Sequence, residues 1–274
     1  MNKTCPVRAT SIAVLLLVGL LLLLLPGPGR ATATSPGLFY FFNPDSGQSN
    51  LSRLKQAMDA VFSAEGFALS FQPFARLRDF ESKVQGEPPG FLFLPEWYIR
   101  QDGNQTRFKP FLAPVRQGVT TYRKVLLVAA DSPVTMKDLA DTTIAMTPMG
   151  PAGMTMLDQV IFKQHGLESG KLKFLPTTKD SDALFALSLR QVNAALVSQD
   201  NLEQLGRINP NILKTVKTLA VSDPMPLPVL CYVQGAVSPA EVEKMKKLFL
   251  AGKQDKNTAT IMEMLQIDAW QTIH

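Results

Sequence analysis

The sequence predicts an α/β protein whose chain forms two lobes. Two series of alternating strand and helix patterns follow one another with short loops, and such βαβ series favour mostly parallel sheets. The chain has 274 residues, enough for two lobes of about 100–150 residues with buried cores. Hydrophobic residues make up 46% of the chain and charged residues 19%, a composition that indicates a globular protein and excludes a disordered one.

The first series begins with the apolar run 38–42, which predicts a strand and ends in turn-forming residues. Between residues 49 and 64, apolar side chains recur at the i, i+3, i+4, i+7 spacing of an amphipathic helix, which Gly66 ends. The following elements are predicted as a strand, a helix, a strand and a longer strand at 67–71, 76–84, 91–94 and 121–130.

The second series continues with a short helix at 134–139, a strand at 143–146 and a loop at 148–153. Then come a helix, a strand, a helix and a strand at 154–164, 172–175, 181–190 and 194–197. Strands at 216–221 and 229–233 are expected to run back between the lobes, and Ser238 and Pro239 open a final helix. We therefore expect one lobe from 34–119 plus 224–274, and the other from 120–223.

Residues 1–33 have the pattern of a secretory signal peptide. Lys3 and Arg8 precede an apolar run at 12–25, and Ala31-Thr32-Ala33 fits the rule of small residues before a cleavage site. The run is shorter than the ~20 residues that cross a bilayer. We expect cleavage after Ala33; an uncleaved anchor is the alternative.

Charge and cysteine content exclude several classes of function. The formal charge is +5, but without Lys3, Arg8 and Arg30 there are 25 basic residues against 23 acidic ones, so no nucleic-acid partner is expected. With only two histidines and two cysteines, a Cys/His zinc site is nearly excluded, and so is a disulfide scaffold. We expect no metal and no cofactor.

Four loops at the ends of predicted strands are candidates for a binding site, because ligands of open α/β sheets bind outside the carboxyl ends of strands. The sharpest candidate is 147–155, which joins a strand to a helix where free backbone amides favour anions. The amides of Gly153, Met154 and Thr155, with the hydroxyls of Thr147 and Thr155, are candidates to cradle an oxyanion. An ordinary strand–helix turn is the alternative.

The other three loops offer polar or aromatic side chains. In the second, Asp180 or Ser181 caps the next helix, or Asp180 accepts a hydrogen bond from an amine-bearing ligand. In the third, Trp97 and Tyr98 offer a flat wall with a polar edge, with core packing as the alternative. The fourth carries three side chains that can donate to a ligand or simply form a turn, Asn43, Ser46 and Gln48.

The residues form no recognisable catalytic cluster. The sequence holds no Gly-x-Ser-x-Gly, P-loop or Gly-x-Gly-x-x-Gly motif. Cys231 lies in a predicted strand, which favours a buried, inert thiol over a nucleophile. His165 next to Gly166 is expected to face solvent at a helix end.

Three residue pairs flank the strand predicted at 121–130 and the next strand: Tyr122-Arg123 before the first, Asp131-Ser132 after it, and Asp138-Leu139 before the second. This pattern resembles the phosphate/phosphonate-type solute-binding proteins of ABC importers. The resemblance extends over about 37–250 and is best at 120–205. It implies a two-lobed, type II periplasmic-binding-protein fold with mixed, mostly parallel sheets, a hinge and a ligand cleft between the lobes.

The resemblance also implies site residues. The aromatic residue of the family matches Tyr98, and its oxyanion-binding helix start falls on Gly150-Pro151-Ala152-Gly153, without the hydroxyls of the family. Its His-Asp pair falls on Asp180-Ser181, without the histidine. Backbone donors alone would hold a monoanion or a neutral polar solute better than a dianion. With no catalytic and no metal-binding residue, the expected ligand-binding residues are Asn43, Ser46, Tyr98, Tyr122, Thr147, Gly150, Gly153, Met154, Thr155, Asp180, Ser181 and Ser198.

Two functions of different class follow. The first is a monomeric periplasmic protein, not an enzyme, that captures a small polar or anionic solute such as a phosphonate-like or phosphate-like oxyanion between its lobes. It would present this solute to an ABC permease or a membrane receptor. The alternative is a ligand-sensing protein or a lyase-type enzyme on the same fold, in which Asp180 or Cys231 would have to act.

Overall fold

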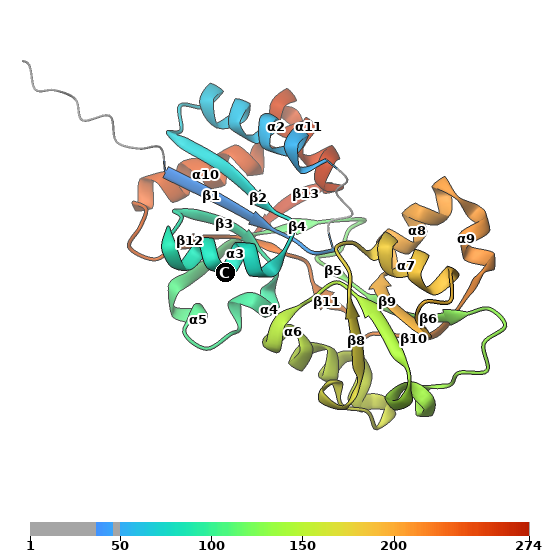
Figure 1. The fold of residues 1–274 in the computed structure, drawn as a ribbon. Coiled ribbons are helices and arrows are strands. Elements are labelled where there is room, and N and C mark those ends of the chain that lie inside the picture. The colour runs from blue at the N-terminus through green and yellow to red at the C-terminus, as the bar shows by residue number, and fades with distance from the viewer. Residues whose placement is uncertain (1–36, 46–49, 274) are drawn as a thin grey trace, which may run out of the picture. The chain divides into compact units, whose positions relative to one another are not determined.

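The computed structural model describes residues 37–45 and 50–273, so the predicted signal peptide lies outside the described residues. The described strands form two larger sheets and one small ladder, with helices packed on both sheets (Figure 1). One larger sheet takes its strands from 37–115 and 229–272, and the other from 124–221. We call these parts the first and second lobe. This architecture confirms the predicted α/β class with mixed sheets. Among the described residues, no helix is long and apolar enough to cross a membrane.

The first lobe is built on a sheet with the order β13-β4-β12-β3-β1-β2. In the described chain its strands are β1 (Gly37–Phe42), β2 (Leu69–Phe74), β3 (Phe91–Leu94), β4 (Phe108–Val115), β12 (Val229–Val233) and β13 (Ala269–Thr272). Its helices are α2 (Leu51–Ala64), α3 (Leu77–Gly86), α4 (Glu96–Ile99), α5 (Asn104–Arg107), α10 (Pro239–Ala251) and α11 (Lys256–Leu265). β1 runs parallel to β2 and β3, whereas β12 is antiparallel to β3 and β4, and β13 to β4.

The second lobe has a sheet of order β10-β6-β9-β7-β8. The strands described there are β6 (Lys124–Ala129), β7 (Thr143–Met146), β8 (Lys173–Pro176), β9 (Ala194–Ser198) and β10 (Val216–Val221). The helices are α6 (Gly150–Leu157), α7 (Asp180–Ser188), α8 (Gln199–Ile208) and α9 (Pro210–Lys214). Shorter 3-10 or π turns of the two lobes are Met136–Asp141, Asp158–Phe162, Lys163–His165, Ser169–Lys171 and Gly252–Gln254. β7 is parallel to β8 and β9, while β6 is antiparallel to β9 and β10.

Antiparallel pairs are therefore at least as common as parallel pairs among the described strands. The alternating pattern predicted mostly parallel sheets, because it followed only strands joined by crossover helices. β12 enters the first sheet from the second lobe and runs against β3. A small antiparallel ladder of β5 (Thr121–Tyr122) and β11 (Met225–Pro226) lies where the chain passes between the lobes in both directions. We call these two crossing segments the hinge.

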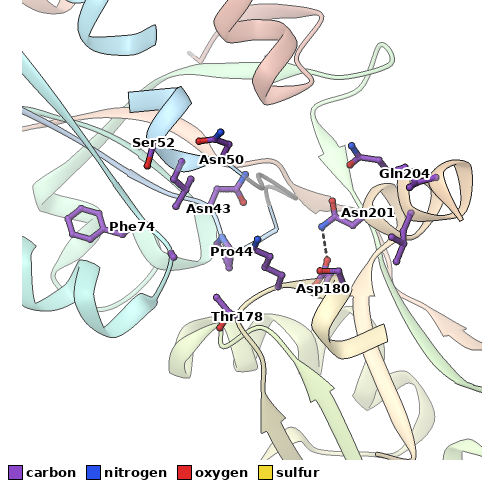
Figure 2. Close-up of a pocket in the computed structure, with 15 residues that line it drawn as sticks. Asn43, Pro44, Asn50, Ser52, Phe74, Thr178, Asp180, Asn201 and Gln204 are labelled. Atoms are coloured by element: carbon purple, nitrogen blue, oxygen red, sulfur yellow. Dashed lines mark hydrogen bonds between the residues drawn. The ribbon is translucent and has the colours of Figure 1, made fainter. Parts of the chain in front are cut away.

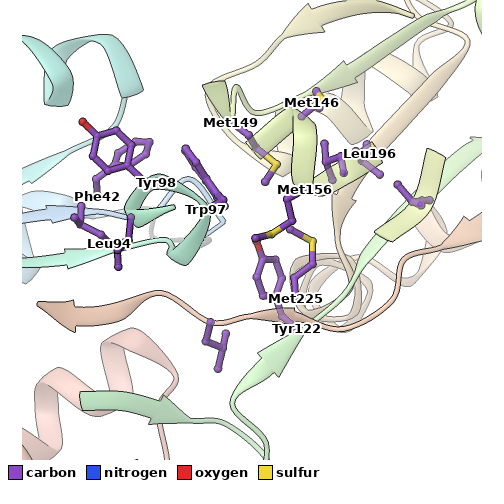
Figure 3. Close-up of a cluster of buried hydrophobic side chains, with 14 of the residues drawn as sticks. Phe42, Leu94, Trp97, Tyr98, Tyr122, Met146, Met149, Met156, Leu196 and Met225 are labelled. Carbon is purple, nitrogen blue, oxygen red and sulfur yellow. The ribbon is translucent and has the colours of Figure 1, made fainter. Parts of the chain in front are cut away.

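Alternating side chains of β1 explain how the first sheet is buried on both faces. Phe39 and Phe41 pack under α2, α10 and α11, while Tyr40 and Phe42 face the side of α3 and α4. The apolar cluster around Tyr40 and Phe42 extends through Trp97 into the second lobe (Figure 3). The two lobes are therefore in contact through apolar side chains next to the hinge.

Some element predictions were wrong, for local reasons. β4 was missed because Pro110 and Pro114 interrupt its apolar run, although both prolines lie within the ladder. The strand predicted at 121–130 is two strands separated by Arg123. The segment 148–153, expected as a loop, already contains the start of α6 at Gly150.

Candidate functional site

Two cavities lie where strand ends of both lobes meet. β1 and β2 end there from the first lobe and β7 and β8 from the second, the position at which open α/β sheets bind ligands. The first cavity, of about 410 Å³, lies between the start of α2 and the helices α7 and α8 (Figure 2). The second, of about 430 Å³, lies between the start of α3 and the ends of β7 and β8. Pro44, Ala75 and Thr178 line both cavities, so the two are neighbours.

Asp180 lines the first cavity with a carboxylate that is only partly satisfied. It is 3% exposed, and its Oδ2 accepts hydrogen bonds from the backbone N–H of Ser198 and from Asn201 Nδ2, both at 2.8 Å. Its Oδ1 is buried and has no partner. Burial raises the pKa of Asp180; the charge of Lys124 opposes this effect and that of Asp45 adds to it. Such a group suits a solute that supplies a hydrogen-bond donor.

A buried ion pair joins the two lobes beside this carboxylate. Lys124 on β6 pairs through Nζ with Asp45, which follows β1; their side chains are 0% and 8% exposed. The hydroxyl of Tyr122 donates to Asp45 Oδ2 at 2.8 Å, and Asn201 Nδ2 donates to the Asp45 carbonyl at 3.2 Å. Burial would lower the pKa of Lys124, but Asp45 and Asp180 together raise it. The lysine is therefore charged, and when both carboxylates are ionised this group carries one excess negative charge.

Several predicted site residues lie at or next to the first cavity. Asn43 and Ser181 line it together with Asp180. Ser198 is buried behind Asp180, and its hydroxyl caps α8 by accepting from the Asn201 N–H at 3.2 Å. Ser46 lies outside the described residues. The expected capping of α7 by Asp180 or Ser181 was wrong, because the N-cap residue precedes both and makes no side-chain cap bond.

The start of α6 packs against the first lobe and lines neither cavity. Gly150 has φ +68°, which glycine adopts at little cost, and a Cβ there would lie 3.1 Å from Leu77 Cδ2. A Cβ at Gly153 would lie 3.3 Å from Trp97 Cδ2. Thr155 is exposed, and its hydroxyl donates to a backbone carbonyl one turn earlier at 3.1 Å. In this arrangement, the turn that the sequence assigned to an oxyanion lies against apolar side chains.

Tyr98 and Met154 lie in or against the hydrophobic core. The ring of Tyr98 contacts Phe80, with a centroid distance of 5.1 Å, and also Phe108. It lies beside Trp97 as well (Figure 3). Burial raises the pKa of Tyr98 to about 12. Met154 is half-buried against the same cluster. These positions correspond to the core-packing alternative.

Thr147 is the polar residue of the predicted oxyanion loop that reaches a cavity, next to Pro148. It is 1% exposed, lines the second cavity, and its Oγ1 has no hydrogen-bond partner. Thr177 lines the same cavity with a hydroxyl oxygen that is also buried and unpartnered. Arg76 and Arg78 line it from the first lobe.

Five residues at the two cavities or beside them were not predicted from the sequence: Asp45, Lys124, Asn201, Arg76 and Arg78. For Lys124 a signal existed, because it opens the apolar run KVLLVA, in which every residue is buried. A lysine there needs a partner of opposite charge. Asp45 stood in a turn sequence, where acidic residues are common without any ligand, so nothing singled it out.

Two further predictions concern reactive side chains. Cys231 is buried, as expected, and burial raises the pKa of its thiol, which disfavours the reactive thiolate. His165 is exposed at the end of a short helical turn, as expected. Among the described residues, no three His, Cys, Asp or Glu side chains are grouped so that they could hold a metal ion.

Solved structures of other proteins share the fold of this chain. A binding-protein component of an ABC phosphonate transporter from Pseudomonas aeruginosa has a similar structure, with a TM-score of 0.71 and 14% identity over 88% of this chain and 82% of that one. PhnD1 from Prochlorococcus marinus, in complex with methylphosphonate, gives a TM-score of 0.70 and 11% identity over 88% and 94%. A Xanthomonas citri protein bound to ATP gives 0.66 and 13% over 88% and 92%. At these identities the likeness shows the fold alone.

The sequence itself carries the family assignment. No curated protein matches the sequence. The family model of the periplasmic substrate-binding proteins of phosphonate ABC transporters matches residues 50–274. This match confirms the resemblance noted around residues 121–148. The chain belongs to the family of periplasmic substrate-binding proteins of phosphonate ABC transporters.

Proposed function

We propose that the mature chain is a monomer that captures one small polar solute in the cavities between its lobes and delivers it to an ABC permease. Members of its family bind small solutes in the periplasm and work with permeases. Cleavage after Ala33, the monomeric state and the place of the solute are parts of this proposal.

The observation that carries the proposal is the carboxylate of Asp180. A buried acceptor without a partner costs the folded protein about 1–3 kcal/mol, so a donor from a solute is worth correspondingly more there. Asp180 belongs to the second lobe, whereas Asn43 and Asn50 line the same cavity from the first. A solute that binds both sides favours the closed arrangement of the lobes.

The contacts between the lobes near the hinge support closure as a defined state. Asp45 of the first lobe is held by Lys124 and Tyr122 and, through its carbonyl, by Asn201. These three partners all belong to the crossing segment or the second lobe. An opening that moves Asp45 away from the second lobe would cost these contacts, so they favour the closed arrangement together with the solute.

The test is a binding screen with the chain that begins at residue 34. Native mass spectrometry identifies any co-purified small molecule. Thermal unfolding is then followed with methylphosphonate, other phosphonates, inorganic phosphate, sulfonates and carboxylates. At one hundred times its dissociation constant, a ligand stabilises the protein by ~2.7 kcal/mol. The absence of both a co-purified solute and any stabilisation would contradict the proposal.

A matched pair of variants locates the solute. Asp180→Asn removes the negative charge of the carboxylate to which the unpartnered oxygen belongs. It is expected to weaken binding about 10- to 100-fold. Asp182→Asn removes the same charge from an exposed position of the same first helical turn and is expected to bind as the wild type does. Equal affinities of the two variants would place the solute elsewhere.

A further inference from the structure

We propose that the anionic group of the solute binds in the second cavity, between Arg76 and Arg78 of the first lobe and Thr147 and Thr177 of the second. The inference rests on the proposed function and deepens it. It moves the anion from the first turn of α6, where the sequence placed it, to a cavity that keeps Thr147 of the predicted loop and adds Arg76, Arg78 and Thr177, which no sequence pattern singled out.

The two threonines supply the first line of evidence. Both hydroxyl oxygens are buried without a partner at the ends of β7 and β8, and Thr147 is almost completely inaccessible. A buried hydroxyl can donate one hydrogen bond and accept two, so leaving it unused is costly. An oxyanion accepts hydrogen bonds from hydroxyl donors, and such charge-assisted bonds are the strong ones.

The charges around the cavity supply the second line. Among the described residues, the guanidinium groups of Arg76 and Arg78 make no ion pair and no hydrogen bond. Glu81 lines the same cavity, and burial raises its pKa. Two guanidinium groups against one carboxylate leave an excess of one positive charge. The cavity therefore suits a group with a single negative charge.

The start of α3 adds to this preference. The helix has ten residues and begins at Leu77 without a side-chain cap, so its first N–H groups lack the usual acceptor. Asp79 in the first turn offsets part of the positive helix end, but it is not among the residues that line the cavity. The start of α3 with its two arginines and the two threonines that follow β7 and β8 thus line one cavity from three elements.

The start of α6 likewise has no side-chain cap, but its first turn holds no arginine and no unpartnered buried hydroxyl. Its glycines lie against Leu77 and Trp97, and the hydroxyl of Thr155 is already engaged with the backbone. An anion at that turn would lie beside the apolar side chains of Leu77 and Trp97. In the second cavity it meets arginines of one lobe and hydroxyls of the other, so its binding also favours closure.

Two threonine variants separate the two placements. Thr147→Val and Thr155→Val each remove one hydroxyl and keep the shape of the side chain. The probes are methylphosphonate and inorganic phosphate, titrated calorimetrically into the chain that begins at residue 34. The second cavity predicts a loss of at least about tenfold for T147V and no change beyond about twofold for T155V. The reverse result would restore the anion to α6 and overturn the inference.

A double variant tests the arginines. Arg76→Gln with Arg78→Gln is expected to weaken anion binding at least about tenfold, and the loss should shrink as salt concentration rises. Lys137→Gln with Lys214→Gln removes the same charge from exposed positions of the second lobe and should preserve binding. Circular dichroism and thermal melting verify that each variant is folded.

The outcomes also separate this inference from the proposed function. If the wild type binds an anion and both T147V and the double arginine variant keep full affinity, the anion site is elsewhere and the proposed function stands. If the wild type binds neutral solutes only, the inference is refuted and the proposed function stands. If it binds no solute and carries none after purification, both fail.

Discussion

Replacing Lys124 with methionine is expected to destabilise the protein by about 3–5 kcal/mol at pH 7. The lysine side chain is fully buried and pairs with Asp45, and the charge of Asp180 also acts on it. Methionine fills the space of the lysine stem, so the substitution removes the charge with little change in packing. Two buried carboxylates then lack their shared cation, and the cost is that of uncompensated charge.

The cost of Lys124→Met depends on pH, and its sign follows from the pKa shifts. The pKa of Lys124 is raised above 10.5, so its pairing stabilises the folded state fully below pH 10.5 and is lost as pH rises through the raised pKa. In the variant, the charges of Asp45 and Asp180 repel each other unless Asp180, whose pKa burial already raises, binds a proton. The destabilisation should therefore shrink as pH falls toward about 4.

The measurement is urea unfolding followed by tryptophan fluorescence at pH 7 and at pH 4.5. A double-mutant cycle of Lys124→Met and Asp45→Asn is expected to give a coupling of about 2–3 kcal/mol, with the double variant more stable than K124M alone. Lys83→Met is the matched control, because Lys83 pairs with Glu87 on an exposed face of α3. Its unfolding midpoint should stay almost unchanged. A K124M midpoint equal to that of K83M would refute the argument that Lys124 is a buried, paired charge.

Three further outcomes are expected. Thr147→Val should raise the free energy of unfolding by about 1 kcal/mol in urea titrations, because it removes a buried hydroxyl without a partner; a loss of stability would show that the hydroxyl is bonded. Gly153→Ala should lower that free energy by about 1–3 kcal/mol, since its Cβ would lie 2.4 Å from Met149 Cβ; an unchanged melting temperature would contradict this packing. Because the pKa of Asp180 is raised, its contribution to stability is full below pH 3.8 and declines as pH rises through the raised pKa; melting curves of Asp180→Asn should lack this decline.

The fold was predictable where hydrophobic periodicity was regular. The β1 run of Phe39 to Phe42 and the helix that begins at Leu51 carry their period in the sequence, and both formed as expected. β4 could not be found in this way, since its prolines break the pattern while the neighbouring strands β12 and β13 still pair with it. The direction of β12 depends on how the chain returns through the hinge, which no local pattern records.

The candidate site was predictable only as a set of strand ends. Sequence spacing placed Asn43, Asp180 and Ser181 on loops that meet at one cavity. It could not show that Trp97 would cover the start of α6, because this contact joins residues of different lobes. Nor could it show that Arg76 lies opposite Thr147, since the two are brought together only by the relative placement of the two sheets.

The buried oxygens without a hydrogen-bond partner explain why closure of the lobes would depend on the solute. Among the described residues, the buried side-chain oxygens without a partner belong to Thr147 and Thr177, which follow β7 and β8, and to Asp180 at the start of α7; the other unpartnered atoms are the indole nitrogens of Trp97 and Trp270. When the lobes separate, water can reach these oxygens, and when the lobes close the water must leave. Closure therefore costs free energy at these three atoms unless a solute replaces the lost hydrogen bonds. A chain built in this way couples closure to the chemistry of its solute, because a molecule without matching polar groups leaves that cost in place.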